Sequence, residues 1–94
     1  MKAERVAEVL ARHGVPADAG PAALIDALRG RGWQVVVDEG VGQTGHRRVT
    51  ATAWRTAVSA TLDAPYRQTL RAGKPTEGAA LAELLAKALE REAP

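Results

Sequence analysis

Several residue types that carry chemistry are absent or scarce in this chain. It contains no cysteine, which excludes disulfide bonds and thiolate metal sites. Ser59 is the only serine, His13 and His46 are the only histidines, and nothing ties them into a nucleophile–base pair. No apolar run approaches the roughly 20 residues of a membrane helix, and no signal-peptide core follows Met1. We therefore expect a cytoplasmic protein that is not an enzyme and binds no metal or cofactor.

Aromatic residues are also scarce. Phenylalanine is absent, and two tryptophans and one tyrosine are the only aromatic residues among 94. A chain of this length forms one domain with one core, so we treat residues 1–94 as a single domain. Because alanine buries little apolar area, the core depends on a few leucine, valine and tryptophan side chains. Self-association would add to this limited core.

The clearest structural signal lies near the end of the chain, in residues 76–90. Apolar side chains recur there at the spacing of a helix with one apolar stripe, namely Leu81, Leu84, Leu85, Ala88 and Leu89. Thr76 is a good N-cap and directly follows Pro75. Glu83 and Lys87 form an i,i+4 pair, which we place on the exposed side of the helix. The pattern predicts a helix that packs on a sheet.

The rest of the chain predicts two helices and three strands before that helix. The helices span about residues 3–13 and begin again at residue 21, and the strands span residues 33–38, 47–54 and 66–72. Residues 56–62 either continue the second strand past a bulge or form a strand of their own, and residues 63–65 are a turn. The order predicts an α+β fold: an N-terminal helix (1–14), then an α-β-β-β-α sandwich (20–92) with helices on one face of an antiparallel sheet.

Residues 40–45 and the two acids before them contain patterns found in nucleotide-binding loops and in catalytic sites. Gly40, Gly42 and Gly45 match the bare dinucleotide-binding pattern, but a strand pattern follows where a helix should meet the pyrophosphate. Asp38 and Glu39 are adjacent, so they point to opposite faces of a strand and form no facing carboxylate pair. We interpret residues 40–45 as a hairpin loop.

Side chains alternate along the second and third strands, and one of the two sets is polar and basic. Val49, Ala51 and Ala53 suit the buried face, whereas Thr50 and Thr52 belong to the polar one. Residues 46–75 carry six basic side chains against Asp63 alone, a net charge of +5, whereas residues 76–94 carry −2. The sequence therefore predicts a basic sheet face that contacts a partner through Arg48, Trp54, Arg67 and Arg71.

From Gly20 onward the chain resembles the double-stranded RNA-binding domain. The stretches that carry the resemblance are GPAALIDALRGRGW, GHRRVTATAW and AGKPTEGAALAELLAKALE. The layout is also similar to small phage-encoded α–β–β–β–α sandwich proteins, through GRGW and KPTEGAALAELLAKAL. The resemblance implies the α-β-β-β-α fold, with His46 as the loop histidine that reaches a minor groove and Asp26 near an acidic contact of the first helix.

The family's phosphate-binding cluster is missing from this chain. The family places Lys-Lys-x-Ala-Lys at the start of the last helix, where residues 77–81 read Glu-Gly-Ala-Ala-Leu. A carboxylate there repels phosphates, which supply most of the affinity of such modules. We therefore expect a non-enzymatic binding or accessory protein that meets a protein partner or a second copy through its open sheet face. The alternative is a nucleic-acid-binding module, double-stranded RNA-like or single-stranded, with contacts from His46, Arg47 and Lys74.

Overall fold

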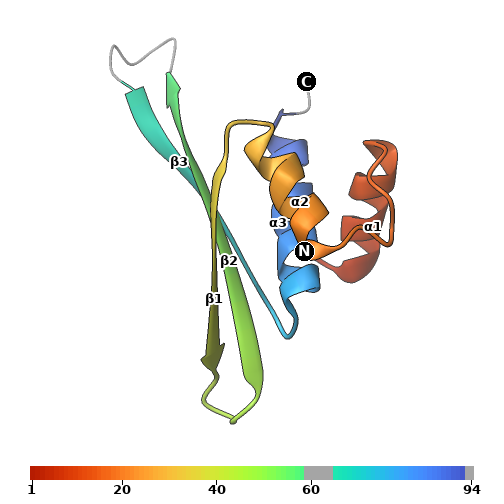
Figure 1. Ribbon diagram of the computed structural model, residues 1–94, viewed down its shortest axis with the longest axis vertical. Helices are drawn as coiled ribbons and strands as arrows, with labels where there is room; N and C mark the ends of the chain where they lie inside the picture. The colour runs from red at the N-terminus through yellow and green to blue at the C-terminus, as the bar shows by residue number, and fades with distance from the viewer. Residues whose placement is uncertain (59–64, 93–94) are drawn as a thin grey trace.

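The computed structural model describes residues 1–58 and 65–92 and shows three helices on one side of a three-stranded sheet (Figure 1). The elements are α1 (Ala3–Arg12), α2 (Pro21–Arg29), β1 (Gln34–Val41), β2 (Arg47–Val58), β3 (Pro65–Lys74) and α3 (Glu77–Glu92). The strand order is β1-β2-β3, and both pairings are antiparallel. The predicted α+β fold, with an extra helix before an α-β-β-β-α order, is confirmed.

The β1–β2 hairpin is longer than the sequence predicted. Gly40 and Val41, which we expected in a loop, pair with Arg48 and Arg47 as the last residues of β1. The turn is closed by the Gly42 N–H, which donates to the His46 carbonyl at 2.9 Å, and Gly45 has a φ of 81° that suits glycine. Because the turn closes between residues 42 and 46, the two residues before it are drawn into the strand pairing.

β2 and β3 form a second long hairpin. β2 continues without a bulge as far as Val58, which stands opposite Pro65, and β3 extends to Lys74 opposite Val49. This answers the question left open at residues 56–58 in favour of one continuous strand. Residues 59–64, which include Ser59 and most of the expected turn at 63–65, lie outside the described residues.

α3 is the central element of the fold. It packs against β2 and β3 on one side and against α1 and α2 on the others, and α1 lies beyond it from the sheet (Figure 1). The predicted stripe is confirmed as core, with Leu84 and Leu85 fully buried. Because α1 covers the side of α3 that faces away from the sheet, burial extends almost around the helix. Our placement of Glu83 on the exposed side was therefore wrong: Glu83 is only 4% exposed.

In the part of the chain that the structure describes, helices cover one face of the sheet and leave the other uncovered. Val49, Ala51 and Ala53 of β2 are buried under the helices, beside Leu70 and Ala72 of β3. The alternation predicted for the second and third strands is thus confirmed. Trp33, expected as the first residue of a strand, instead precedes β1 and is 1% exposed in the core. Among the residues described, none of the helices has the length and apolar character needed to cross a membrane.

Candidate binding surface

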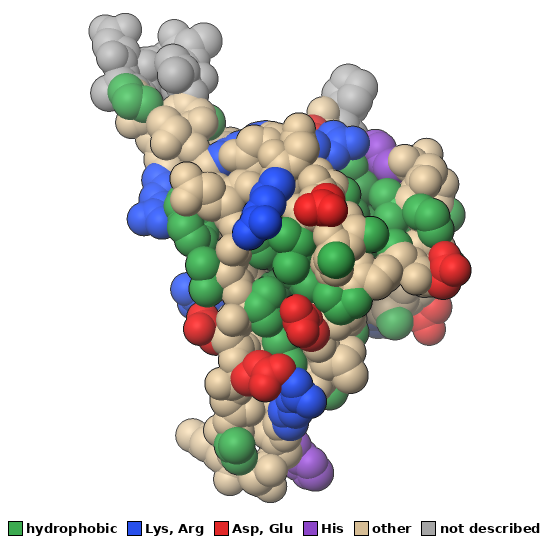
Figure 2. Space-filling view, in the orientation of Figure 1, with side chains coloured by type: hydrophobic (Ala, Val, Ile, Leu, Met, Phe, Trp, Pro, Cys, Tyr) green, Lys and Arg blue, Asp and Glu red, His purple; other side chains and the backbone are tan. Residues whose placement is uncertain are grey.

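The face of the sheet opposite the helices carries the residues that the sequence singled out. We call it the open face; it consists of the side chains of the three strands that alternate with the buried ones. Trp54 lies in its cross-strand row between Gln34 and Thr69, and the next row places Thr52 between Val36 and Arg71. In Figure 2, basic and hydrophobic side chains both gather along the left margin, the sheet side of the molecule.

Trp54 and Arg67, two of the four residues predicted for the partner surface, are in direct contact. The guanidinium carbon of Arg67 lies 5.1 Å from the centroid of the Trp54 ring. Arg67 stands opposite Thr56, so Trp54 and Arg67 are diagonal neighbours across the β2–β3 pair. Such a cation–π contact contributes about 0.5–1 kcal/mol at an exposed site. It also holds an arginine head group over an aromatic ring that is only partly buried.

Arg48 and Arg71 lie on the same face, at increasing distance from the tryptophan. Arg71 is exposed beside Thr52, one row away from Trp54. Arg48 lies across Gly73, since a Cβ at Gly73 would come within 2.7 Å of the Arg48 Nη2. At about 3.3 Å per residue, Arg48 and Trp54 are roughly 20 Å apart along β2. The four residues therefore share a face but form an elongated stripe rather than a compact cluster.

Val36 belongs to this surface as well, and sequence analysis missed it. It is 42% exposed and stands opposite Thr52 in the middle of the open face. Val35, Val36 and Val37 are chemically identical neighbours, so composition alone does not reveal which of them faces outward. The strand register supplies that information, because Val35 pairs with buried Ala53.

His46, Arg47 and Lys74, predicted as nucleic-acid contacts, lie together at the β1–β2 turn rather than on the open face. They line a hollow of about 200 Å³ between the turn and the end of β3. Arg47 forms an ion pair with Glu39, and Lys74 lies 3.7 Å from the carboxylate of Glu83. Both basic side chains, Arg47 and Lys74, are thus partly neutralised by neighbouring acids.

Arg55 shows that the positive charge of residues 46–75 does not all belong to one surface. Its guanidinium carbon lies 4.3 Å from the centroid of the Trp33 ring, on the helix side of the sheet. It donates hydrogen bonds to Gln68 at 2.7 Å and to Glu92 at 2.8 Å. The +5 charge of residues 46–75, which supported the prediction of a basic face, is therefore divided between the two faces of the sheet. Arg48, Arg67 and Arg71 are the basic side chains that the open face presents among the described residues.

Glu92 joins this arginine to the end of α3. It also accepts hydrogen bonds from Arg31 at 2.5 Å and from the indole N–H of Trp33 at 3.4 Å. Burial opposes the ionisation of Glu92, but the hydrogen bonds and charge of these donors outweigh it and hold the pKa of Glu92 below its usual 4.5. The network fixes the C-terminal turn of α3 against the core.

Glu83 is a second acid on α3 that is paired with cations; it is buried and lies near the middle of the helix. Its carboxylate lies 2.8 Å from the amino group of Met1 and 3.7 Å from both Lys74 and Lys87. Burial alone would raise the pKa of Glu83, but the hydrogen bond from Met1 and the charges of Lys87 and Lys74 lower it below 4.5. We interpret buried Glu83 and half-buried Glu92 as parts of the scaffold, because each is already surrounded by its own cations.

The two histidines lie in different parts of the structure, and the neighbouring acids Asp38 and Glu39 lie on opposite faces of β1. His13 is exposed as the C-cap of α1, which ends at Arg12 and thus one residue earlier than expected, and His46 lies in the β1–β2 turn. Asp38 belongs to the open face and Glu39 to the opposite one. Across residues 1–58 and 65–92, no group of three histidine or acidic side chains is arranged to hold a metal ion.

Comparison with known protein families, curated proteins and solved structures found no match to this chain. The order of one helix, three antiparallel strands and a last helix is established by the structure. The likeness to double-stranded RNA-binding domains and to phage sandwich proteins stays a resemblance in sequence. Function is therefore inferred from the surfaces of this chain alone.

Proposed function

We propose that this protein is a small non-enzymatic binding protein that docks an acidic protein partner on its open sheet face. The observation that carries the proposal is the contact between Trp54 and Arg67 on the face that the described helices leave uncovered. Tryptophan and arginine are the side chains that most often supply the binding energy of protein interfaces. Val36 and the threonines beside Trp54 give the partner an apolar and hydrogen-bonding floor.

The charge of the open face favours an acidic partner over a second copy of the chain. Arg48, Arg67 and Arg71 stand against Asp38 as the acidic side chain that the described strands present there. A symmetric dimer brings the same patch together from both subunits, and like charges that meet across an interface are destabilising. Acidic side chains of a partner would instead complement the arginines, and apolar side chains of that partner would pack on Trp54.

Selection from a displayed random-peptide library tests the proposal even before a partner has been identified. Peptides that bind the native protein and are lost on the Trp54→Ala variant should be rich in aspartate and glutamate. Tyr66→Ala is the matched control, because Tyr66 is an exposed aromatic residue on β3 whose side chain points to the opposite face. Peptides that bind the Trp54→Ala variant as well as the native protein would place the binding site elsewhere.

Oligonucleotide titrations decide between a protein and a nucleic acid on the same face. If Arg48, Arg67 and Arg71 each neutralised one phosphate of a single strand, affinity would fall roughly 20-fold between 50 and 200 mM salt. We expect no such salt-dependent binding of single- or double-stranded oligonucleotides. Binding with that salt slope, weakened by Arg67→Ala, would replace the protein partner with nucleic acid. Light scattering at two protein concentrations tests the homodimer in the same samples.

A further inference from the structure

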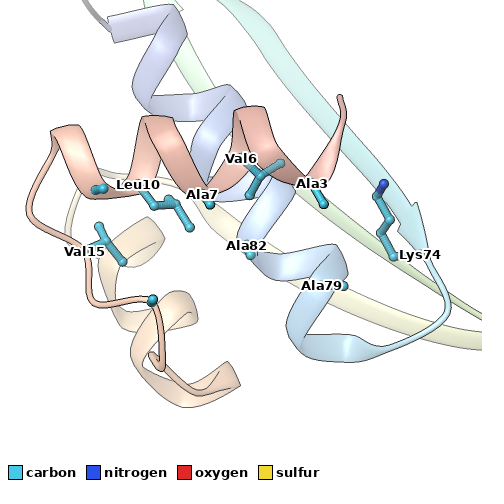
Figure 3. A pocket seen from close by; sticks show the side chains of 10 residues that line it. Ala3, Val6, Ala7, Leu10, Val15, Lys74, Ala79 and Ala82 are labelled. Atoms are coloured by element: carbon cyan, nitrogen blue, oxygen red, sulfur yellow. The ribbon is translucent and has the colours of Figure 1, made fainter.

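An apolar groove lies on the helical side of the molecule, away from the open face. It has a cavity volume of about 280 Å³ and runs between α1 and α3 (Figure 3). Leu10 and Val15 lie at one end of it, and Lys74 lies at the other. Among the described residues, Lys74 is the single charged one in its lining.

Small side chains create this groove. Ala3, Ala7 and Ala11 recur every four residues along one side of α1, and Ala79 and Ala82 face them from α3. A methyl group does not reach across the space between two packed helices, whose axes lie 8–10 Å apart as a rule. The alanines of α1 are exposed to solvent for the same reason. The result is an apolar slot that the described residues leave unfilled.

The Lys74 end of the groove has more positive than negative charge. Lys74 and Lys87 both lie 3.7 Å from the single carboxylate of Glu83. One carboxylate shared by two ammonium groups neutralises neither of them fully. The amino group of Met1 adds a third cation to the same carboxylate. Lys74 thus retains attraction for a further anion at the point where the apolar slot ends.

We propose that the groove between α1 and α3 binds a free medium-chain carboxylic acid, with its alkyl chain along the alanines and its carboxylate at Lys74. Ala3 and Ala11 are separated by eight residue steps, roughly 12 Å at the helical rise of 1.5 Å per residue. An extended alkyl chain of eight to ten carbons is about as long. The proposal concerns a site separate from the open face and does not depend on the function proposed there.

Titration calorimetry with hexanoate, octanoate and decanoate, each below the concentration at which it forms micelles, tests the chain-length requirement. Each methylene buried in the groove should strengthen binding roughly fourfold, until the slot is full. Binding should be saturable with one site per chain. Non-saturable uptake, or affinity that does not change with chain length, would refute the groove as a binding site.

Two variants locate the ligand. Ala82→Leu fills the slot and should abolish decanoate binding while the melting temperature is kept or raised; Ala7→Leu repeats the test from α1. Ala23→Leu is the matched control, since Ala23 is an exposed alanine of α2 outside the groove. Decanoate affinity that is unchanged in both Ala82→Leu and Ala7→Leu would overturn the proposal.

Substitution of Lys74 tests whether this residue binds the carboxylate of the acid. Lys74→Gln should weaken decanoate at least tenfold and leave the neutral analogue 1-octanol unaffected. Equal weakening of both ligands would mean that Lys74 shapes the groove without binding the carboxylate. Light scattering tests whether a second copy of the chain occupies the groove instead. A dimer that the Ala82→Leu substitution dissociates would assign the groove to that second copy and refute the carboxylic-acid proposal.

Discussion

Glu83→Gln removes one negative charge from the inner part of the fold and leaves the volume of the side chain unchanged. The Glu83 carboxylate forms an ion pair with the amino group of Met1 at 2.8 Å and lies 3.7 Å from the ammonium groups of two lysines. Hydrogen bonds to charged groups contribute about 1.5–3 kcal/mol each when both partners are held in place. Lys74 and Lys87 are 31% and 33% exposed, so water hydrates them once the carboxylate is gone. We expect a loss of about 2 kcal/mol in the free energy of unfolding.

The matched control for this change is Glu8→Gln on α1. Glu8 also accepts hydrogen bonds from two cations, Arg5 at 3.2 Å and Arg12 at 2.7 Å, but its side chain is 58% exposed. Exposed ion pairs contribute about 0–1 kcal/mol. Urea denaturation at pH 7 should therefore separate the two variants. A domain of this size loses about 4–8 °C in melting temperature per kcal/mol, so Glu83→Gln should melt roughly 8–16 °C lower.

The effect of Glu83→Gln should depend on pH. Because the pKa of Glu83 is lower in the folded protein than its usual 4.5, the ionised carboxylate stabilises the fold above about pH 4.5. That contribution is lost as the pH falls through the lowered pKa, so the native protein and the variant should converge in stability in acid. Equal losses for Glu83→Gln and Glu8→Gln, or a difference that persists unchanged in acid, would show that Glu83 is not the buried anion described here.

Two further changes test the last helix. Leu84→Ala and Leu85→Ala each remove a fully buried side chain and should cost about 2–5 kcal/mol in urea denaturation; an unchanged unfolding midpoint for either would exclude that leucine from the core. Thr76→Ala removes the cap whose hydroxyl accepts the Ala79 N–H at 3.2 Å, and should cost about 0.5–2 kcal/mol by thermal melting, whereas Thr76→Ser should retain most of the stability. Equal stability of the alanine and serine variants would mean that the cap does not contribute.

Local periodicity in the sequence determined the elements and their buried faces. The stripe from Leu81 to Leu89 predicted α3, and the alternation from Arg48 to Trp54 predicted which side of β2 lies under the helices. Both patterns record which neighbours along one helix or strand share a side, which is a local property of the chain. The four residues expected on the open face were found in the same way.

The tertiary structure alone decided what covers each element and which charges meet. Glu83 looked exposed because its helix needed only one apolar stripe to bind the sheet, yet α1 covers the other side. Arg55 counted toward the positive charge of residues 46–75, yet it is paired with Glu92 from the far end of the chain. Arg31 is paired with the same acid across a separation of 61 residues. Burial and ion pairing depend on elements brought together from distant parts of the chain. A pattern read over a few neighbouring residues carries no information about such partners.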